Sequence, residues 1–167
     1  MTTLLAGMGN PILSDDAVGP RLARDLAAAL GPVPGLEVLP ECAVGGLALL
    51  DVLAGHDRAI VVDSVATTAG TVGAWHHLDA RALRETMHLA SIHDANFATV
   101  LELGRRLGVP LPHPEDIHLL VVEIDDARTF SEAMTPALEE RYPALAREII
   151  GAVRALLETP AATEVRP

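Results

Sequence analysis

Short apolar runs alternate with longer amphipathic stretches along the chain. Strands are expected at about residues 3–7, 36–43, 59–62, 72–78 and 117–124, which are rich in apolar side chains, and residues 59–62 form a nearly continuous apolar run. Apolar residues with helical spacing occupy about residues 16–30, 95–107 and 136–157, and a short helix is expected after the glycine pair at 45–46. This alternation predicts an α/β fold: a single domain over residues 1–158, built as a three-layer sandwich with a mostly parallel central sheet. Residues 159–167 are expected to form a flexible C-terminal tail.

The carboxyl ends of parallel strands are the usual place for a functional site in such a sheet. In this sequence they correspond to residues 9–16, residues 63–68 and the loop that ends at His93. Each of these segments contains a side chain that can bind a cation or transfer a proton.

The first segment is a glycine-rich turn followed by two adjacent carboxylates. The turn at residues 7–11 reads GMGNP, and Asp15 and Asp16 stand at the start of the next helix. A glycine-rich turn before a helix commonly binds phosphate, but two carboxylates would repel phosphate and attract a cation. Capping of the helix needs only one of the two. The other is therefore a candidate metal ligand or catalytic group.

Asp63 and His93 represent the other two segments. Asp63 follows the most apolar strand, where a carboxylate is costly unless it is paired, solvated or metal-bound; capping of the following loop is the alternative. His93 precedes a helix at a loop that returns to the same edge, and the alternative is an ordinary surface histidine. With one carboxylate of the pair at 15–16, they form a mixed oxygen and nitrogen set that nickel or zinc accepts. The other six histidines are interpreted as incidental: His56, His76, His77, His88, His113 and His118.

The charge and composition exclude several partners. The chain has 23 acidic and 12 basic residues and a formal net charge of −11, so DNA, RNA and anionic lipid surfaces are not expected partners. One Trp, one Tyr and two Phe leave few rings for stacking nucleic-acid bases. No apolar run is long enough to span a bilayer and no signal peptide precedes the first strand, which predicts a cytoplasmic protein.

The single cysteine, Cys42, excludes an intramolecular disulfide and a cysteine-based zinc site. It lies in the apolar stretch LEVLPECAVGG, and we interpret it as a small buried side chain rather than a nucleophile. The HExxH, GxSxG and cysteine–histidine patterns are absent from the sequence, so it lacks the catalytic motifs of the standard hydrolases.

The opening segment resembles that of the nickel–iron hydrogenase maturation endopeptidases. That family begins with the pattern G-x-G-N-x-L-x-x-D-[DE]-x-x-G, and residues 7–19 here read GMGNPILSDDAVG, with Ile12 in place of the usual Leu. Two further motifs follow in the family's order: Asp63 in AIVVDSV and His93 in SIHDANFATVLEL. Residues 42–46 resemble the family's glycine pair before a helix. The resemblance covers residues 3 to about 150.

The resemblance implies an activity and a set of site residues. Members have a phosphorylase/hydrolase-like α/β fold and remove a C-terminal peptide from the hydrogenase large-subunit precursor, using the nickel already inserted there for recognition. Their metal-binding residues correspond to Asp16, Asp63 and His93, and Asp16 is one methylene shorter than the Glu that many members carry. Nickel is therefore expected to come with the substrate rather than to be permanently bound. The group that activates the attacking water is left open, with Asp16 and Asp63 as candidates.

Two other functions are consistent with parts of the pattern. Peptidyl-tRNA hydrolases also open with G-x-G-N-P, but they continue with a histidine–asparagine pair where this chain has Asp15 and Asp16, and they need a basic face for tRNA. A non-catalytic nickel-binding maturation factor would share the metal ligands without the cleavage. A dinucleotide-binding site is disfavoured, because the third glycine of its fingerprint would fall on Ile12.

Overall fold

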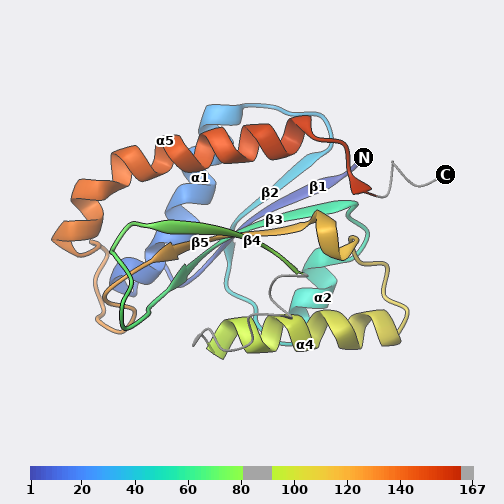
Figure 1. Ribbon diagram of the computed structural model, residues 1–167, viewed down its shortest axis with the longest axis horizontal. Helices are drawn as coiled ribbons and strands as arrows, with labels where there is room; N and C mark the ends of the chain where they lie inside the picture. Colours follow the sequence, from blue (N-terminus) through green and yellow to red (C-terminus); the bar gives the residue numbers. More distant parts are fainter. Residues whose placement is uncertain (81–91, 163–167) are drawn as a thin grey trace.

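A five-stranded, mostly parallel sheet forms the centre of the molecule (Figure 1). The computed structural model describes residues 1–80 and 92–162, with the backbone alone for 92–96. The strands are β1 (Thr3–Met8), β2 (Leu36–Cys42), β3 (Arg58–Val65), β4 (Trp75–Asp79) and β5 (Ile117–Glu123), in the order β2-β1-β3-β5-β4. All neighbouring pairs are parallel except β4 and β5. The predicted α/β class with a mostly parallel sheet is therefore confirmed.

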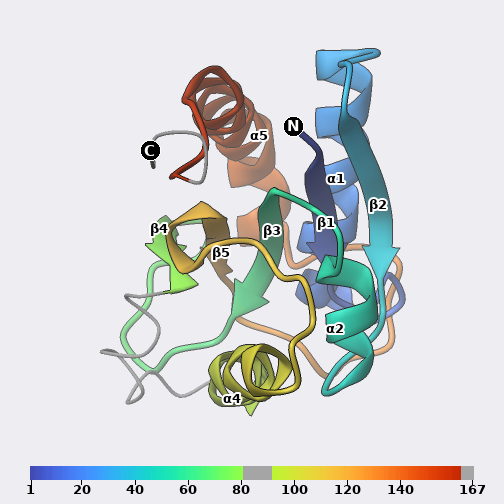
Figure 2. The ribbon, with the colours of Figure 1, turned by 90° about the vertical axis from the view of Figure 1, so that its right-hand side faces the viewer.

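Helices cover both faces of the sheet, as a three-layer sandwich requires (Figure 2). One face packs against α1 (Val18–Leu30) and α5 (Pro136–Glu158), and the other against α2 (Ala48–Leu53) and α4 (Ile92–Arg106). A separate apolar cluster fills the space between the sheet and the helices on each face. Alternate residues of each strand contribute their side chains to the two clusters.

The alternation along β3 decides where Asp63 points. Ile60 and Val62 belong to the cluster under α1 and α5, whereas Val61 and Val65 belong to the cluster under α2 and α4. Asp63 shares the second face because side chains two residues apart in a strand lie on the same side. The strand also continues for two residues beyond Asp63, because pairing with β5 extends to Val65. The expectation that the strand ends at Asp63 is wrong.

Glycines let the first helix lie directly against the first strand. A Cβ on Gly19, in the first turn of α1, would meet the carbonyl oxygen of Met8 at 2.0 Å. Gly9 has a φ of +131°, which favours glycine, and a Cβ there would meet the carbonyl oxygen of Asp16 at 2.1 Å. The turn after β1 therefore packs closely against the segment that carries Asp16.

A short 3-10 helix, η1 (Ser14–Ala17), precedes α1, so the helix predicted from residue 16 is divided in two. A second 3-10 helix, η2 (Pro114–Asp116), leads into β5. Within the described residues, no helix combines the length and apolar character that crossing a bilayer requires.

The chain beyond α5 begins by packing against the domain. The buried Arg58 guanidinium donates to the carbonyl oxygens of Leu156 and Thr159, at 2.5 and 2.7 Å. The Ala162 N–H donates to the carboxylate of Asp116 at 2.9 Å. Residues 163–167 lie outside the described residues, and the flexible tail over 159–167 stays a prediction.

Candidate active site

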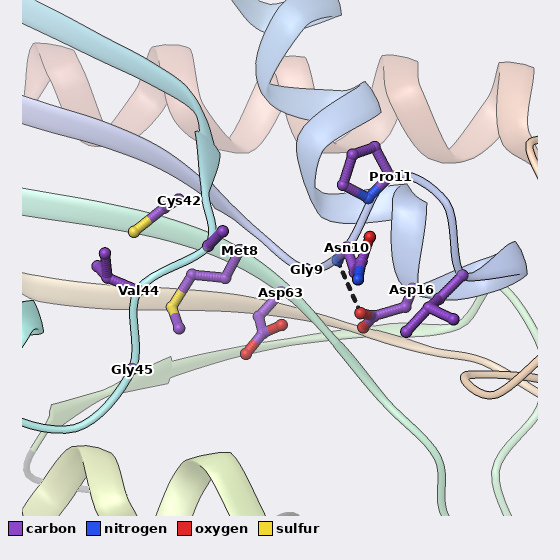
Figure 3. A pocket seen from close by; sticks show the side chains of 11 residues that line it. Met8, Gly9, Asn10, Pro11, Asp16, Cys42, Val44, Gly45 and Asp63 are labelled. Carbon is purple, nitrogen blue, oxygen red and sulfur yellow. Dashed lines mark hydrogen bonds between the residues drawn. The ribbon is translucent and has the colours of Figure 1, made fainter. Parts of the chain in front are cut away.

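A pocket of about 360 Å³ opens at the carboxyl ends of β1, β2 and β3 (Figure 3). Its walls come from the turn after β1, the segment that follows β2, and the later part of β3. Both Asp16 and Asp63 line it, as do Met8, Asn10 and Cys42. The structure thus brings together two of the three residues that the sequence selects as metal ligands.

Asp16 is held in one orientation by two hydrogen bonds. Its Oδ2 accepts the backbone N–H of Asn10 at 2.8 Å, and its Oδ1 accepts the hydroxyl of Ser64 at 2.6 Å. The carboxylate therefore connects the turn after β1 with the strand β3. The residues at the N-caps of η1 and α1 are Leu13 and Ala17, and neither helix start has a side-chain cap. Asp16 lines the pocket instead of serving as a cap.

Asp15, its neighbour, points away from the pocket and anchors a distant loop. It is fully buried and accepts the N–H of Thr135 at 2.6 Å and the Thr135 hydroxyl at 3.0 Å. The N–H groups of Asp125 and Asp126 also donate to it, at 3.2 and 3.1 Å. Helix capping, the alternative role for one of the two carboxylates, is therefore not what Asp15 does: it stabilises the connection between β5 and α5.

Asp63 is 8% exposed, and its Oδ1 accepts the backbone N–H of Ser64 at 2.7 Å. Figure 3 shows its carboxylate in the pocket beside the side chain of Met8. Such a buried carboxylate is suited to a cation, because neighbouring apolar groups reduce the competition from water.

Cys42 lies in the wall of the same pocket and is 2% exposed. Burial raises the pKa of its thiol, and the negative charge of Asp63 raises the pKa further, while a hydrogen bond with the backbone of Val44 opposes both effects. The thiol is therefore protonated at neutral pH, which agrees with a small buried side chain rather than a nucleophile.

His93 lies in the first turn of α4, and its side chain is outside the described residues. The helix begins at Ile92, three residues earlier than the sequence suggests. Figure 1 shows this end of α4 on the side where the parallel strands end, and α4 covers the sheet face that carries Asp63. The role of His93 as a ligand stays a prediction. Among the residues whose side chains are described, no group of three or more His, Cys, Asp or Glu is arranged to hold a metal ion.

Sequence reasoning missed a further buried carboxylate near this edge, Glu123 at the end of β5. Its Oε2 accepts the Thr67 hydroxyl at 2.9 Å, and its Oε1 lies 3.4 Å from Nε2 of His76. Glu123 pairs with Val65, which lies two residues after Asp63 in β3. The side chain of Glu123 therefore lies on the same face of the sheet as that of Asp63. These contacts hold the connection between β3 and β4. The signal was present in the sequence, since Glu123, like Asp63, is an acidic residue that follows a run of apolar residues.

Neither a protein-family model nor a curated protein sequence matches the chain, but several solved structures resemble it closely. The hydrogenase maturating endopeptidase HybD from E. coli superposes with a TM-score of 0.71 at 24% identity, with 93% of each chain covered. An endopeptidase from Escherichia coli, solved in solution, gives a TM-score of 0.72 at 26% identity over 93% of each chain. The [NiFe] hydrogenase maturation protease HycI from Thermococcus kodakarensis KOD1 gives 0.66 at 22% identity, over 92% of each chain.

These similarities extend over nearly the whole chain, and they confirm that the α/β sandwich is that of the proteases to which the opening motif is similar. The pocket described above lies at the carboxyl ends of the strands, where α/β sheets of this type commonly bind their ligands.

Proposed function

We propose that this chain, which has the fold of the hydrogenase maturation endopeptidases, is itself a cytoplasmic endopeptidase of that kind. In this proposal it removes the C-terminal extension of a nickel–iron hydrogenase large-subunit precursor after nickel has been inserted. The observation that supports it best is the pair of carboxylates, Asp16 and Asp63, on one pocket of a fold shared with such proteases.

In this proposal Asp16, Asp63 and His93 recognise the nickel ion that the precursor carries. Carboxylate oxygens and an imidazole nitrogen form a donor set that nickel accepts. Asp16 is already oriented by Asn10 and Ser64, so little side-chain freedom is lost when it contacts a cation. Three ligands would leave positions for the precursor's own groups, which is why we expect the metal to arrive with the substrate.

Cleavage also requires a water molecule placed at the scissile carbonyl and a group that accepts its proton. Asp16 and Asp63 are the candidates, because both line the pocket and an ionised carboxylate oxygen accepts hydrogen bonds through more than one lone pair. Cys42 is not a candidate, since burial keeps its thiol protonated.

The proposal is tested by substituting the pocket carboxylates and following cleavage of a nickel-loaded precursor by gel and mass spectrometry. Asp16→Asn and Asp63→Asn keep the shape but remove the charge, and each should reduce the cleavage rate at least a hundredfold. Asp16→Glu should retain activity. Asp51→Asn, an exposed carboxylate on α2, is the matched control and should cleave normally.

Wild-type rates from the Asp16→Asn protein would remove Asp16 from the site. Nickel binding by the purified wild-type protein without any cleavage would instead favour a non-catalytic nickel-binding factor.

A further inference from the structure

Two histidines that the proposed function does not use lie in direct contact on the opposite face of the sheet. The Nε2 atom of His77 on β4 is 3.2 Å from the Nδ1 atom of His118 on β5, and their ring centroids are 5.2 Å apart. The antiparallel register places Asp79 opposite His118, with His77 two residues earlier on the same strand. All three side chains therefore share one face at the edge of the sheet.

This separation of two ring nitrogens fits two ligands of a single metal ion. At a metal–nitrogen distance of about 2.0–2.1 Å, two ligand nitrogens lie about 2.9 Å apart at a right angle and about 3.4 Å apart at a tetrahedral angle. A hydrogen bond between two imidazoles gives a similar separation in the absence of metal, so the distance allows an ion to replace that hydrogen bond without movement of either strand.

The surroundings allow an ion to reach the two rings, and they contain charges of both signs. His77 is exposed, which gives an ion access from solvent, while His118 is half-buried and held in the sheet by its strand. Two carboxylates, Asp79 and Asp116, act on His118 and oppose the positive charge of the neighbouring Arg58. Imidazole nitrogens bind nickel, zinc and copper in preference to magnesium or calcium.

We propose that His77 and His118 form a second metal site, which binds one borderline divalent ion such as Ni²⁺ through two imidazoles, with water in the remaining positions. A site with two protein ligands is consistent with the described side chains, among which no group of three or more His, Cys, Asp or Glu is arranged to hold a metal ion. The site is separate from the pocket. His118 pairs with Ile60 of β3 and faces α5, whereas Asp63 lies three residues further along and faces α4.

The test is a calorimetric titration of chelator-treated full-length protein with NiCl₂. The pocket is first disabled by combining Asp16→Asn, Asp63→Asn and His93→Asn, and one Ni²⁺ should still bind. Adding His77→Asn or His118→Asn should weaken that binding at least tenfold. His76→Asn is the matched control, since His76 is an exposed neighbour on the same strand whose side chain points to the other face.

A second measurement locates the ion in the wild-type protein. Paramagnetic Ni²⁺ should broaden the ring-proton resonances of His77 and His118 in NMR spectra at lower concentrations than those of His56 and His113. The His77→Asn variant is expected to fold, because the residue is exposed, so the test does not depend on His118→Asn. Absence of Ni²⁺ binding to the pocket-disabled protein, or equal weakening by His76→Asn, would overturn the proposal.

Discussion

At the scale of single residues, two neighbouring carboxylates have opposite roles. Asp15 is fully buried and joined to backbone and side-chain donors about 110–120 residues away, whereas Asp16 lines the pocket. The sequence shows that two acids stand together at this turn, but only the distant contacts of Asp15 show which one is structural. Local patterns do not contain such contacts, because they depend on how the loop after β5 returns to the turn after β1.

Replacing Asp15 with Ala should therefore destabilise the fold. The change leaves the Thr135 N–H and hydroxyl and the N–H groups of residues 125 and 126 without their acceptor. Loss of these partly buried hydrogen bonds to a buried carboxylate should cost about 2–4 kcal/mol in total. Urea unfolding followed by circular dichroism measures the loss. Asp51→Ala, on the exposed side of α2, should change stability by less than about 0.5 kcal/mol. Equal effects of the two changes would contradict this role for Asp15.

The Cys42 thiol should react slowly with alkylating reagents in the folded protein. Burial raises its pKa, and the side chain is 2% exposed, so little reactive thiolate reaches solvent at pH 8. Labelling with iodoacetamide, followed by intact-mass spectrometry, should proceed at least tenfold more slowly than for the same protein in guanidinium chloride. Comparable rates in the two conditions would show that the thiol is accessible.

At the scale of elements, the periodicity of the sequence predicts the strands and helices to within a few residues, because each buries one face or one stripe of apolar side chains. The periodicity does not predict element boundaries that depend on strand pairing or on close packing. The strand β3 runs past Asp63 because its neighbour β5 continues to pair with it. The first helix is preceded by a 3-10 turn, in a segment that the close approach of α1 to β1 constrains.

That close approach makes a prediction about Gly19. A methyl group at this position would lie 2.0 Å from the Met8 carbonyl oxygen, so Gly19→Ala should force α1 away from β1 and cost about 2 kcal/mol or more. Gly151→Ala is the control: this glycine lies on an exposed part of α5 with nothing within 4 Å of the new methyl group. It should stabilise the protein by about 0.5–1 kcal/mol. Thermal unfolding of both variants gives the comparison, and a neutral Gly19→Ala change would contradict the packing argument.

At the scale of the whole molecule, the two sheet faces carry different chemistry. η1, which follows β1, and the later part of β3 present Asp16 and Asp63 to a pocket. The rule that such edges hold functional sites pointed to residues 9–16 and 63–68 in the sequence, and the resemblance to the maturation endopeptidases then pointed to Asp16 rather than Asp15. The pairing of His77 with His118 could not be anticipated in the same way, because it depends on the antiparallel register of β4 against β5. The sequence pattern predicted β4 but not its direction or partner.

Global stability should fall as the solution becomes acidic, in the presence of a chelator. Burial, with the nearby His77 and Arg58, lowers the pKa of His118 to about 4 from its ordinary value of 6.5. Partial desolvation of the largely exposed His77 ring, where it contacts its surroundings in the sheet, also lowers the pKa of His77. The unfolded chain therefore binds protons near pH 6.5 that the folded protein does not bind until about pH 4, and stability is lost as the pH falls through this interval. Thermal unfolding between pH 7 and 4 measures this loss, and His118→Asn should make the profile flatter. A pH profile identical to that of the wild-type protein would contradict the assignment of this loss to His118.

The central claim is that the pocket at Asp16 and Asp63 serves a protease that acts on a nickel-loaded precursor. The most direct measurement is mass spectrometry of a purified hydrogenase large-subunit precursor, incubated with the purified chain in nickel-loaded and nickel-free forms. The account predicts release of the C-terminal peptide from the nickel-loaded form alone, with its loss in the Asp16→Asn and Asp63→Asn proteins. Release of the peptide from the nickel-free precursor, or no release from either form, would contradict it.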